Sequence, residues 1–342
     1  MKKYSIAPSN LNNERSQVRR RFVLQAIGAT ASTMTFGLST AADPFPAAPI
    51  KLIVPYPPGG ATDTIGRQLA IEASKALGQQ VVVENKPGAA GNLGVIATIN
   101  ASADGYTVVL AGSNNVAADP IQEKMPFVPM RDLVPVAPVV AIPYVVVANP
   151  AFAPNNIREL IAAAKANPGK INFASSGTGG PPHFASELIK SQAGLDMQHV
   201  PYKGAVPAFT DVVGGQVQFI TGDINTAMPF LQSGRLKAIA TTGKERLELL
   251  PNVPTVAESG LPGYESEGWF GVFASSKTPP EIVAALTRGF VKATQEADFK
   301  KRMGVLGGRV LSMGKADFDR YIASETIKRS NLIKSNKIVL DN

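Results

Sequence analysis

The sequence predicts an α/β protein of two lobes, and three features of the chain support this fold class. Short apolar runs alternate with helical patterns, as they do in layered α/β folds. Two stretches, residues 51–70 and 171–190, share the order strand, loop of small residues, amphipathic helix. Proline-rich breaks at residues 141–150 and 251–268 divide the chain into thirds. We interpret these breaks as two crossings between lobes that contain largely parallel sheets.

Apolar runs and helical spacing place the individual elements along the chain. The strand candidates are residues 50–55, 80–84, 106–111, 144–148, 170–175, 219–221, 236–241 and 270–274. Helical spacing of apolar residues follows at 65–77, 157–164, 184–188 and 282–290. The first and last segments, 42–142 and 267–342, are expected to form one lobe, and residues 143–266 the other. The two similar strand–loop–helix units would then face each other across a cleft.

Composition limits the chemistry that this chain is expected to perform. The chain has 342 residues, of which 44% are apolar, so two domains could each bury a core. It contains no cysteine, which excludes disulfides, thiolate catalysis and zinc–sulfur sites. Because His183 and His199 are the only histidines, we expect neither a metal nor another cofactor.

The N-terminal 41 residues have the pattern of a cleavable export signal peptide. Arg19, Arg20 and Arg21 precede an uncharged stretch that polar residues dilute, which disfavours a permanent membrane anchor. The order of arginines and apolar residues resembles a twin-arginine signal, and an ordinary secretory leader is the alternative. Either route ends outside the cytoplasm, so we expect a periplasmic protein cleaved near Ala41.

Removal of this leader also removes most of the positive charge. The full chain has a formal charge of +8, and residues 42–342 keep 28 basic and 25 acidic side chains, a charge of +3. No later segment combines dense lysine and arginine with aromatic residues. We therefore expect no nucleic-acid partner.

The first glycine loop, residues 56–63, has the features of a small-anion site. Gly59 and Gly60 would let the backbone approach a ligand, and backbone N–H groups at a helix N-terminus attract anions. Thr62 offers a hydroxyl, while Asp63 would cap the helix or hold a bridging water. No lysine follows the glycines, so this is not a nucleoside-triphosphate loop. A helix entry without a ligand is the alternative.

The second glycine loop, residues 175–182, offers hydroxyls and glycines before a helix that begins with prolines. A carboxylate there would accept hydrogen bonds from backbone N–H groups and from the hydroxyls of Ser176 and Thr178. A solvent-exposed turn is the alternative for this loop.

His183 lies close in sequence to Ser176, which raises a hydrolase alternative. In that alternative the imidazole would activate the serine hydroxyl. No nucleophile elbow and no carboxylate that would orient the ring can be identified. We therefore expect a histidine that forms local hydrogen bonds near the helix end.

Several ordered motifs together resemble the extracytoplasmic solute receptors of tripartite tricarboxylate transporters, the Bug receptors. The motifs are VPYPPGG at 54–60 with Thr62-Asp63, ENKPGAAG at 84–91, DGYT at 104–107, HVPYKG at 199–204, DVVGG at 211–215, PNVPTVAESG at 251–260 and GWFG at 268–271. The resemblance covers nearly the whole chain after the leader. It implies a type II-like periplasmic-binding-protein fold, in which two lobes joined by two crossing strands close on a small organic acid without catalysis.

Carried over by position, the resemblance implies a set of ligand-binding residues. The first loop would hold a carboxylate through Gly59, Gly60, Ala61 and Thr62, with Tyr56 as a wall and Asp63 supporting ordered water. The second loop would contribute Ser175, Ser176, Thr178 and Gly179. Asp223 would contact a distal ammonium or hydroxyl group of the ligand.

The resemblance also implies the partners of the protein. These are a small organic carboxylate and the membrane permease subunits of a tripartite transporter, and we expect the receptor to be a monomer. Pro182 supplies no N–H group, which favours an aromatic or small aliphatic acid over a citrate-like polycarboxylate. A ligand-loaded partner of a membrane sensor kinase is the functional alternative, beside the hydrolase.

Overall fold

A computed structural model describes residues 45–118 and 125–338 of the chain. From Phe45 onward the chain forms one compact unit. The predicted signal peptide, with its arginines and its cleavage site near Ala41, lies outside the described residues.

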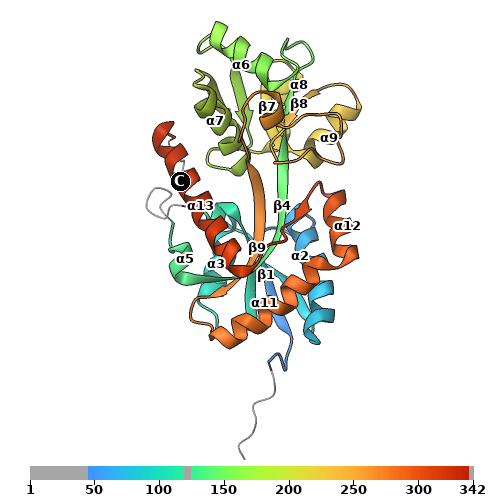
Figure 1. The fold of residues 1–342 in the computed structure, drawn as a ribbon, viewed down its shortest axis with the longest axis vertical. Helices are drawn as coiled ribbons and strands as arrows, with labels where there is room; N and C mark the ends of the chain where they lie inside the picture. The colour runs from blue at the N-terminus through green and yellow to red at the C-terminus, as the bar shows by residue number, and fades with distance from the viewer. Residues whose placement is uncertain (1–44, 119–124, 339–342) are drawn as a thin grey trace, which may run out of the picture. The chain divides into compact units, whose positions relative to one another are not determined.

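The described strands form one ten-stranded sheet with a main order of β2-β1-β3-β9-β4-β7-β5-β6, and β8 and β10 both pair with β4 (Figure 1). The strands are β1 Ile50–Val54, β2 Val81–Asn85, β3 Thr107–Gly112, β4 Leu133–Ala148, β5 Asn172–Ser175, β6 Gln198–Pro201, β7 Phe219–Asp223, β8 Lys237–Thr241, β9 Glu267–Ser275 and β10 Arg309–Val310. All eight predicted strands are confirmed, and β6 and β10 were not predicted.

Strand β4 is long because it serves two parts of the sheet. Residues from Leu133 to Pro143 pair with β9, and Tyr144 to Ala148 pair with β7 and β8. The proline-rich stretch that begins at 141 is therefore continuous strand as far as Ala148, and its reading as a crossing between lobes stays a prediction. Proline lacks the N–H that a ladder needs, and the register with β9 shifts after Pro135 and after Pro138, which accommodates prolines at bulges.

The pairing directions correct a second expectation. Strand β1 is parallel to β2 and β3, and β5 is parallel to β6 and β7, as in βαβ units. Every pairing that involves β4 or β9 is antiparallel. The sheet is thus mixed rather than largely parallel, because the two long strands run in opposite directions between the parallel parts.

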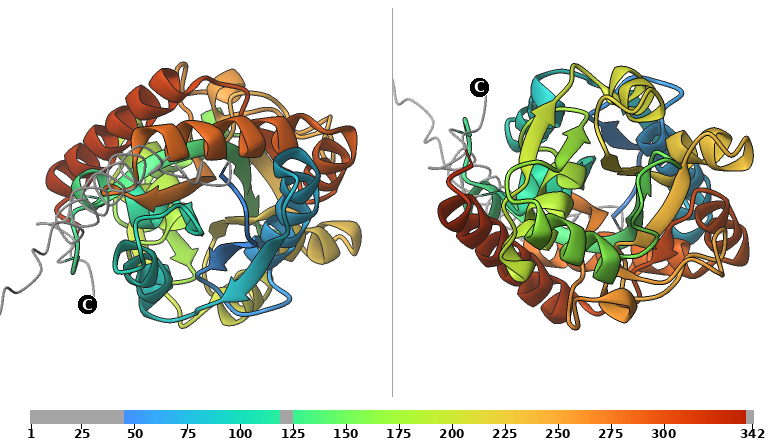
Figure 2. Two further views of the ribbon diagram at one scale, coloured as in Figure 1. Left: turned by 90° about the horizontal axis from the view of Figure 1, so that it is seen from below. Right: turned by 90° about the horizontal axis from the view of Figure 1, so that it is seen from above.

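Helices lie around the strands, as Figure 2 shows from below and from above. They are α2 Ala61–Leu77, α3 Asn92–Ile99, α4 Ser113–Val116, α5 Pro129–Asp132, α6 Ile157–Ala166, α7 Pro181–Ala193, α8 Ala205–Val213, α9 Ile224–Gln232, α10 Val256–Ser259, α11 Pro280–Gln295, α12 Ala297–Val305 and α13 Lys315–Ser335, with a 3-10 turn at Ala89–Gly91. Helices α2 and α11 carry the predicted apolar spacing into the core.

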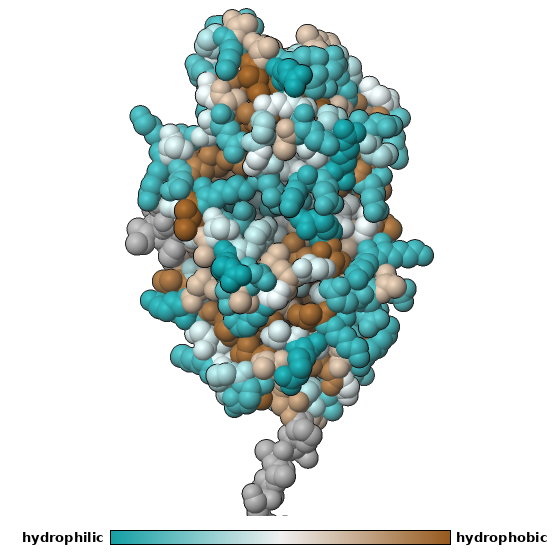
Figure 3. Space-filling model, viewed as in Figure 1, coloured by the Kyte–Doolittle hydropathy of each residue, from teal (hydrophilic) through white to brown (hydrophobic). Residues whose placement is uncertain are grey.

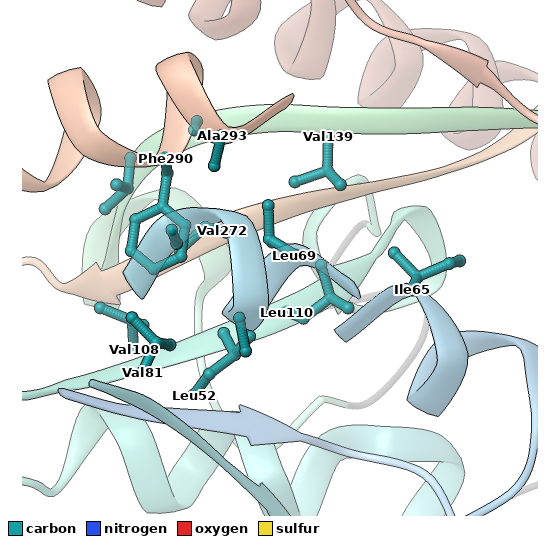
Figure 4. Packing of buried hydrophobic residues seen from close by; sticks show 14 of the residues in the cluster. Leu52, Ile65, Leu69, Val81, Val108, Leu110, Val139, Val272, Phe290 and Ala293 are labelled. Carbon is teal, nitrogen blue, oxygen red and sulfur yellow. The ribbon is translucent and has the colours of Figure 1, made fainter. Parts of the chain in front are cut away.

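Alternation along the strands builds a core on each face of the sheet. Leu52 packs in a cluster with α2 and α11, while its neighbour Ile53 packs in a cluster on the opposite face. Figure 4 shows the first of these clusters, where Phe290 of α11 and Leu69 of α2 meet the strands. In β4, Val146 and Val147 likewise belong to two different clusters beside β5 and β7.

Helix α13 joins two of these clusters. Phe318 and Ile322, in its first turns, pack with Trp269 of β9. Leu332 and Ile333, in its last turns, pack in the cluster built around β5 and α7. One helix therefore connects the core beside β3 and β9 to the core beside the second glycine loop.

Candidate functional site

The two glycine loops connect β1 to α2 and β5 to α7, as the repeated sequence pattern predicts. Helix α2 has Gly60 at its N-cap and α7 has Gly180, and neither N-cap forms a side-chain hydrogen bond. The first N–H groups of a helix have no partner within the helix. Two such ends without a side-chain cap are suited to hold an anion. Pro181 and Pro182 reduce the number of donors that α7 offers.

Asp63 organises the first loop from within. Its Oδ2 accepts hydrogen bonds from the Gly59 N–H at 3.0 Å and from Arg67 Nε at 2.9 Å, and its Oδ1 accepts one from Asn85 Nδ2 at 2.9 Å. The Arg67 hydrogen bond is the largest cause that lowers the Asp63 pKa to about 2. Because the carboxylate is buried, these hydrogen bonds stabilise the loop itself. One of them already uses the Gly59 N–H as a donor.

Tyr56 connects the first loop to two neighbouring segments that the sequence reasoning did not assign to the site. Its hydroxyl lies 3.4 Å from Ala90 O and 3.3 Å from Asn114 Oδ1. The side-chain amides of Asn114 and Asn115 also donate to Ala90 O, at 3.0 and 3.1 Å. The signal was present in the sequence, because the ENKPGAAG motif and the Asn114-Asn115 pair directly follow predicted strands.

The segment around Ala90 has an unusual backbone. Ala89 and Ala90 have φ values of 47° and 52°, in the left-handed region that non-glycine residues seldom occupy. The two side-chain amides and the Tyr56 hydroxyl that donate to Ala90 O hold this conformation. Strain of this kind accumulates at ligand sites, where the surroundings fix a backbone that would otherwise relax.

The second loop divides its residues between internal and exposed positions. Ser175 is buried, donates to Gly177 O at 2.9 Å and lies 2.6 Å from His199 Nε2. Ser176 is exposed, whereas Thr178 and Gly179 are half-buried. Ser176 and Thr178 thus present hydroxyl groups at the loop surface, while Ser175 holds the loop in place.

His183, the base of the disfavoured hydrolase alternative, contacts groups of its own loop and helix. His183 Nδ1 accepts the Gly179 N–H at 3.1 Å, and its Nε2 faces Glu187 Oε1 at 3.8 Å. Its ring stacks on that of His199 with centroids 3.9 Å apart. The histidine therefore fixes the second loop, as expected for a residue that forms local hydrogen bonds.

Tyr144 and Asp223 lie opposite each other where β4 and β7 pair. Burial raises the pKa of Tyr144, and Asp223, Tyr56 and Arg329 all act on it electrostatically. Asp223 stands at the end of β7, at the same edge of the sheet as the second loop. Tyr144 and Asp223 thus lie at the edge of the sheet from which the second loop leaves β5.

Arg329 of α13 supports the second loop from behind. Its Nη2 donates to Gly179 O at 2.9 Å, and its guanidinium lies 4.0 Å from the centre of the Phe184 ring. A cavity of about 50 Å³ beside it is lined by Ser113 of α4 and Pro181 of α7, among others. The segments next to Asn114 and next to the second loop therefore adjoin each other.

Two further properties of the described residues limit what the site can do. No group of three or more potential metal ligands from histidine, cysteine, aspartate or glutamate occurs in the part that the structure describes. Within the same part, no helix has the length and apolar character needed to cross a membrane. On the face that Figure 3 draws, polar side chains predominate and apolar ones appear in small groups.

Two helix N-termini without side-chain caps, together with the hydroxyls of the second loop, are features suited to binding an anionic solute. The family model for the tripartite tricarboxylate transporter family receptor matches residues 65–338. BugT of Bordetella pertussis is 38% identical over 314 residues, covering 91% of this chain and 96% of its own. The chain belongs to this family of periplasmic receptors, and it is not an enzyme.

Solved structures show the same fold. Rpa4515 of R. palustris, solved with adipate, is 27% identical with a TM-score of 0.72, covering 87% of this chain and 100% of its own. MatC from Rhodopseudomonas palustris, solved with bound malate, is 29% identical with a TM-score of 0.68, covering 84% of this chain and 100% of its own. The predicted α/β periplasmic-binding-protein fold is confirmed.

Proposed function

We propose that this receptor binds a small organic carboxylate between two lobes and delivers it to the membrane permease subunits of a tripartite transporter. The observation that carries the proposal is the pair of helix N-termini without side-chain caps, at Gly60 and Gly180, each preceded by a glycine loop that follows a strand. The relatives solved with malate and with adipate support the ligand class.

Each predicted residue has a place in this proposal. Gly60, Ala61 and Thr62 would supply donors from the first loop, with Tyr56 as a wall. Ser176, Thr178 and Gly179 would contact the ligand from the second loop. Gly59, Asp63 and Ser175 are proposed to act mainly by holding the loops, because their polar groups already form hydrogen bonds there. Asp223, at the end of β7, would contact a distal ammonium or hydroxyl group of the ligand.

The proposed lobes are residues 42–142 with 267–342 and residues 143–266, with β4 and β9 as the crossings. Partner exchange in β4 between Pro143 and Tyr144 supports a hinge at this level. A ligand that contacts both loops binds the closed arrangement more tightly and shifts the equilibrium toward it. The last turns of α13, which pack beside α7, would accompany the second lobe.

The proposed cellular setting follows from the family and the leader. A twin-arginine-type signal peptide, cleaved near Ala41, would export the chain to the periplasm. The receptor would act there as a monomer with no nucleic-acid partner, carrying its ligand to the permease. The balanced charge of residues 42–342 supports a carrier that is not held on nucleic acid.

A thermal-shift screen of the full chain against aliphatic, aromatic and amino carboxylates tests this function, with calorimetry on each hit. The variants Ser176→Ala and Thr178→Val should each weaken a hit by about 1 kcal/mol, roughly fivefold, because each removes one hydroxyl donor. Their melting temperatures without ligand should stay unchanged. Ser324→Ala, a serine on α13, is the matched control. A screen without any stabilising carboxylate would refute the proposed function.

A further inference from the structure

We propose that His183 and His199 form a proton-sensitive pair that positions the second glycine loop, and that the receptor therefore binds its ligand more weakly at acidic pH. The inference rests on the proposed function, since the second loop is proposed to contact the ligand. It adds two positioning residues and a pH dependence to that site. These two residues are the only histidines of the sequence.

His183 holds the loop from the first turn of α7. The side chain is buried, and its Nδ1 accepts a hydrogen bond from the Gly179 N–H at 3.1 Å. A ring nitrogen accepts a hydrogen bond only while it carries no proton. The contact with Gly179 therefore requires an unprotonated Nδ1, because a proton there would place two donors against each other.

His199 of β6 holds the beginning of the loop through Ser175. Its Nε2 lies 2.6 Å from Ser175 Oγ, and that hydroxyl also donates to Gly177 O at 2.9 Å. A hydroxyl group has one hydrogen, so with this hydrogen on Gly177 O the imidazole is the donor to Oγ. The two histidines thus fix the loop at both ends, one as an acceptor and the other as a donor.

The two imidazole rings are stacked, which couples their protonation. Their centroids are 3.9 Å apart and their planes differ by 20°. Two positive charges at this distance repel each other strongly, so the pair gains a first proton far more readily than a second. Imidazole is the side chain that ordinarily exchanges protons between about pH 5 and 8.

The carboxylate of Glu187 favours this first proton on His183. Its Oε1 lies 3.8 Å from His183 Nε2, one turn along the same helix. Although burial raises the pKa of Glu187, contacts that include His183 bring this pKa below its ordinary value, so the carboxyl group is ionised. A buried carboxylate attracts positive charge to the imidazole beside it.

Other charged groups near α7 belong to the same helix and to the elements packed on it. Lys190 Nζ lies 3.6 Å from Glu187 Oε1, and Arg329 Nη2 donates to Gly179 O. Strand β5 faces His183 with the uncharged ring of Phe173. Three further charged residues line the cavity beside α7, and these are Glu267, Glu325 and Lys328.

Some carboxyl groups in this region also take up protons on acidification. Burial raises the pKa of Glu267, of Glu325 and of Asp223 at the end of β7. The test therefore compares proteins that differ only at a histidine.

Acidification opposes the loop conformation that is proposed to bind the ligand. The state with the hydrogen bond between Gly179 and His183 holds fewer protons than the state without it. This state is therefore favoured as the pH rises and is lost as the pH falls. Ligand affinity should follow the same sign.

The first test needs no ligand. In long-range ¹H–¹⁵N spectra of the full chain, His183 should show an unprotonated Nδ1 at about pH 8 and gain a proton on acidification to about pH 5. Hydrogen–deuterium exchange in residues 176–184, corrected for the pH dependence of the chemical step, should accelerate over the same range. The first loop contains no histidine, and the pKa of its Asp63 is about 2, so its exchange should stay unchanged.

The second test measures binding by calorimetry at about pH 7.5 and about pH 5.5. The probes are malate and adipate, together with any hit of the thermal-shift screen. His183→Asn keeps an acceptor, Oδ1, in place of Nδ1 and removes the titratable ring. Affinity should fall about fivefold more in the parent chain than in this variant, since one hydrogen bond is worth about that factor. Protonation of the ligand or of other carboxyl groups affects both proteins alike.

A second variant keeps the test decisive. His199→Gln retains a donor in place of Nε2 and should retain the fall in affinity, because His183 is still present. Melting temperatures at neutral pH show whether each variant folds. If His183→Asn does not fold, protonation of His183 in the parent chain without faster exchange in the second loop overturns the proposal.

The outcomes distinguish this inference from the function on which it rests. Exchange or affinity that responds to acid equally in the parent chain and in His183→Asn would overturn the inference and leave the carboxylate receptor standing. If no carboxylate binds at neutral pH, the proposed function is overturned, and the ligand-binding part of this inference with it.

Discussion

Two aspartates of this receptor show how the surroundings of a residue decide its role. Asp63 accepts three hydrogen bonds, one of them from Arg67, and its pKa falls to about 2. Asp223 has no cation that lowers its pKa among the described residues, and burial raises that pKa. The first carboxylate stabilises the folded loop, whereas the second forms no cap hydrogen bond with α9 and is exposed to solvent. Residue type alone does not separate these roles.

Asp63→Asn should destabilise the fold at neutral pH. A shift from 3.8 to about 2 corresponds to at most roughly 2.5 kcal/mol, and because Arg67 is 54% exposed we expect about 1 to 2 kcal/mol. A lowered pKa stabilises the fold above pH 3.8, and this contribution is lost as the pH falls toward 2. Denaturant unfolding at pH 7 and near pH 2 should therefore show a difference only at the higher pH.

The exposed pair of Asp317 and Arg320 provides the control for this prediction. Asp317→Asn should change the unfolding free energy at pH 7 by no more than about 0.5 kcal/mol, because solvent screens the pair. Equal losses for the two variants would contradict the structural role assigned to Asp63.

Adjacent glycines in the first loop give a second residue-scale prediction. Gly59 has a φ of +83°, whereas Gly60 has a φ of −78° that any residue adopts. Gly59→Ala should cost about 1 kcal/mol of unfolding free energy through backbone strain, and Gly60→Ala should cost clearly less. Chemical denaturation of both variants without ligand measures the difference. A larger loss for Gly60→Ala would contradict the left-handed conformation of Gly59 and the extended conformation of Gly60.

At the scale of elements, α13 connects the second glycine loop to the core beside β9. Its Phe318 packs against Trp269, with the ring centroids 5.7 Å apart, and its Leu332 packs beside α7. Asn336, its C-cap residue, donates to Glu187 Oε2 at 2.6 Å, on the same helix as His183. Because both ends of α13 are packed, a movement of α7 relative to β9 would also move or bend this helix.

Arg329→Ala should loosen the second loop. It removes a charge-assisted hydrogen bond to Gly179 O and a cation–π contact with Phe184, together about 1 to 2 kcal/mol of local stability. Hydrogen–deuterium exchange in residues 176–184 should accelerate without ligand. Arg320→Ala, an exposed arginine on the same helix, is the control. Unchanged exchange in Arg329→Ala would show that the loop is held without this contact.

For the molecule as a whole, the mixed sheet joins the strand that leads into the first glycine loop to the strand that leads into the second. The strands β4 and β9 connect the parallel strands β1 to β3 with the parallel strands β5 to β7. Trp269, the single tryptophan of the sequence, is fully buried on β9 between Phe318 and Tyr321. It therefore lies where closure of the proposed lobes would alter packing.

Ligand binding should produce closure that two independent methods detect. Small-angle scattering of the full chain should give a smaller radius of gyration with a binding carboxylate, because contacts to both loops favour the closed arrangement. The fluorescence of Trp269 should change over the same concentration range. Succinamide, an uncharged analogue of succinate, should produce neither effect. Tight binding with unchanged scattering would refute the hinge mechanism.

Much of the fold could be predicted because local patterns are strong. Every apolar run selected from the sequence overlaps a strand, and both glycine loops lie between a strand and a helix. Strand β6 was missed because its residues are only partly buried and form no apolar run. The first part of β4 was missed because its prolines indicate a break, while pairing with β9 at bulges keeps the strand continuous.

Some residues of the candidate site could be predicted from the sequence and others could not. Tyr56, the glycines and the hydroxyls of the second loop were found because each belongs to a recognisable motif. The Ala90 segment, Asn114 and Arg329 were not found, because their relation to the loops arises from contacts between residues far apart in the chain. No periodicity within a short window contains that information.

The sequence by itself determined the α/β class, the two glycine loops and the receptor family, since these depend on local spacing and on ordered motifs. Only the tertiary structure decided that β4 runs continuously through two parts of the sheet and that α13 supports the second loop. It also decided that the Asp63 carboxylate accepts hydrogen bonds within its own loop, whereas the Asp223 side chain forms no cap hydrogen bond. The physical reason is that spacing fixes local conformation and the buried face, whereas the partner of a strand, carboxylate or arginine is chosen by long-range packing.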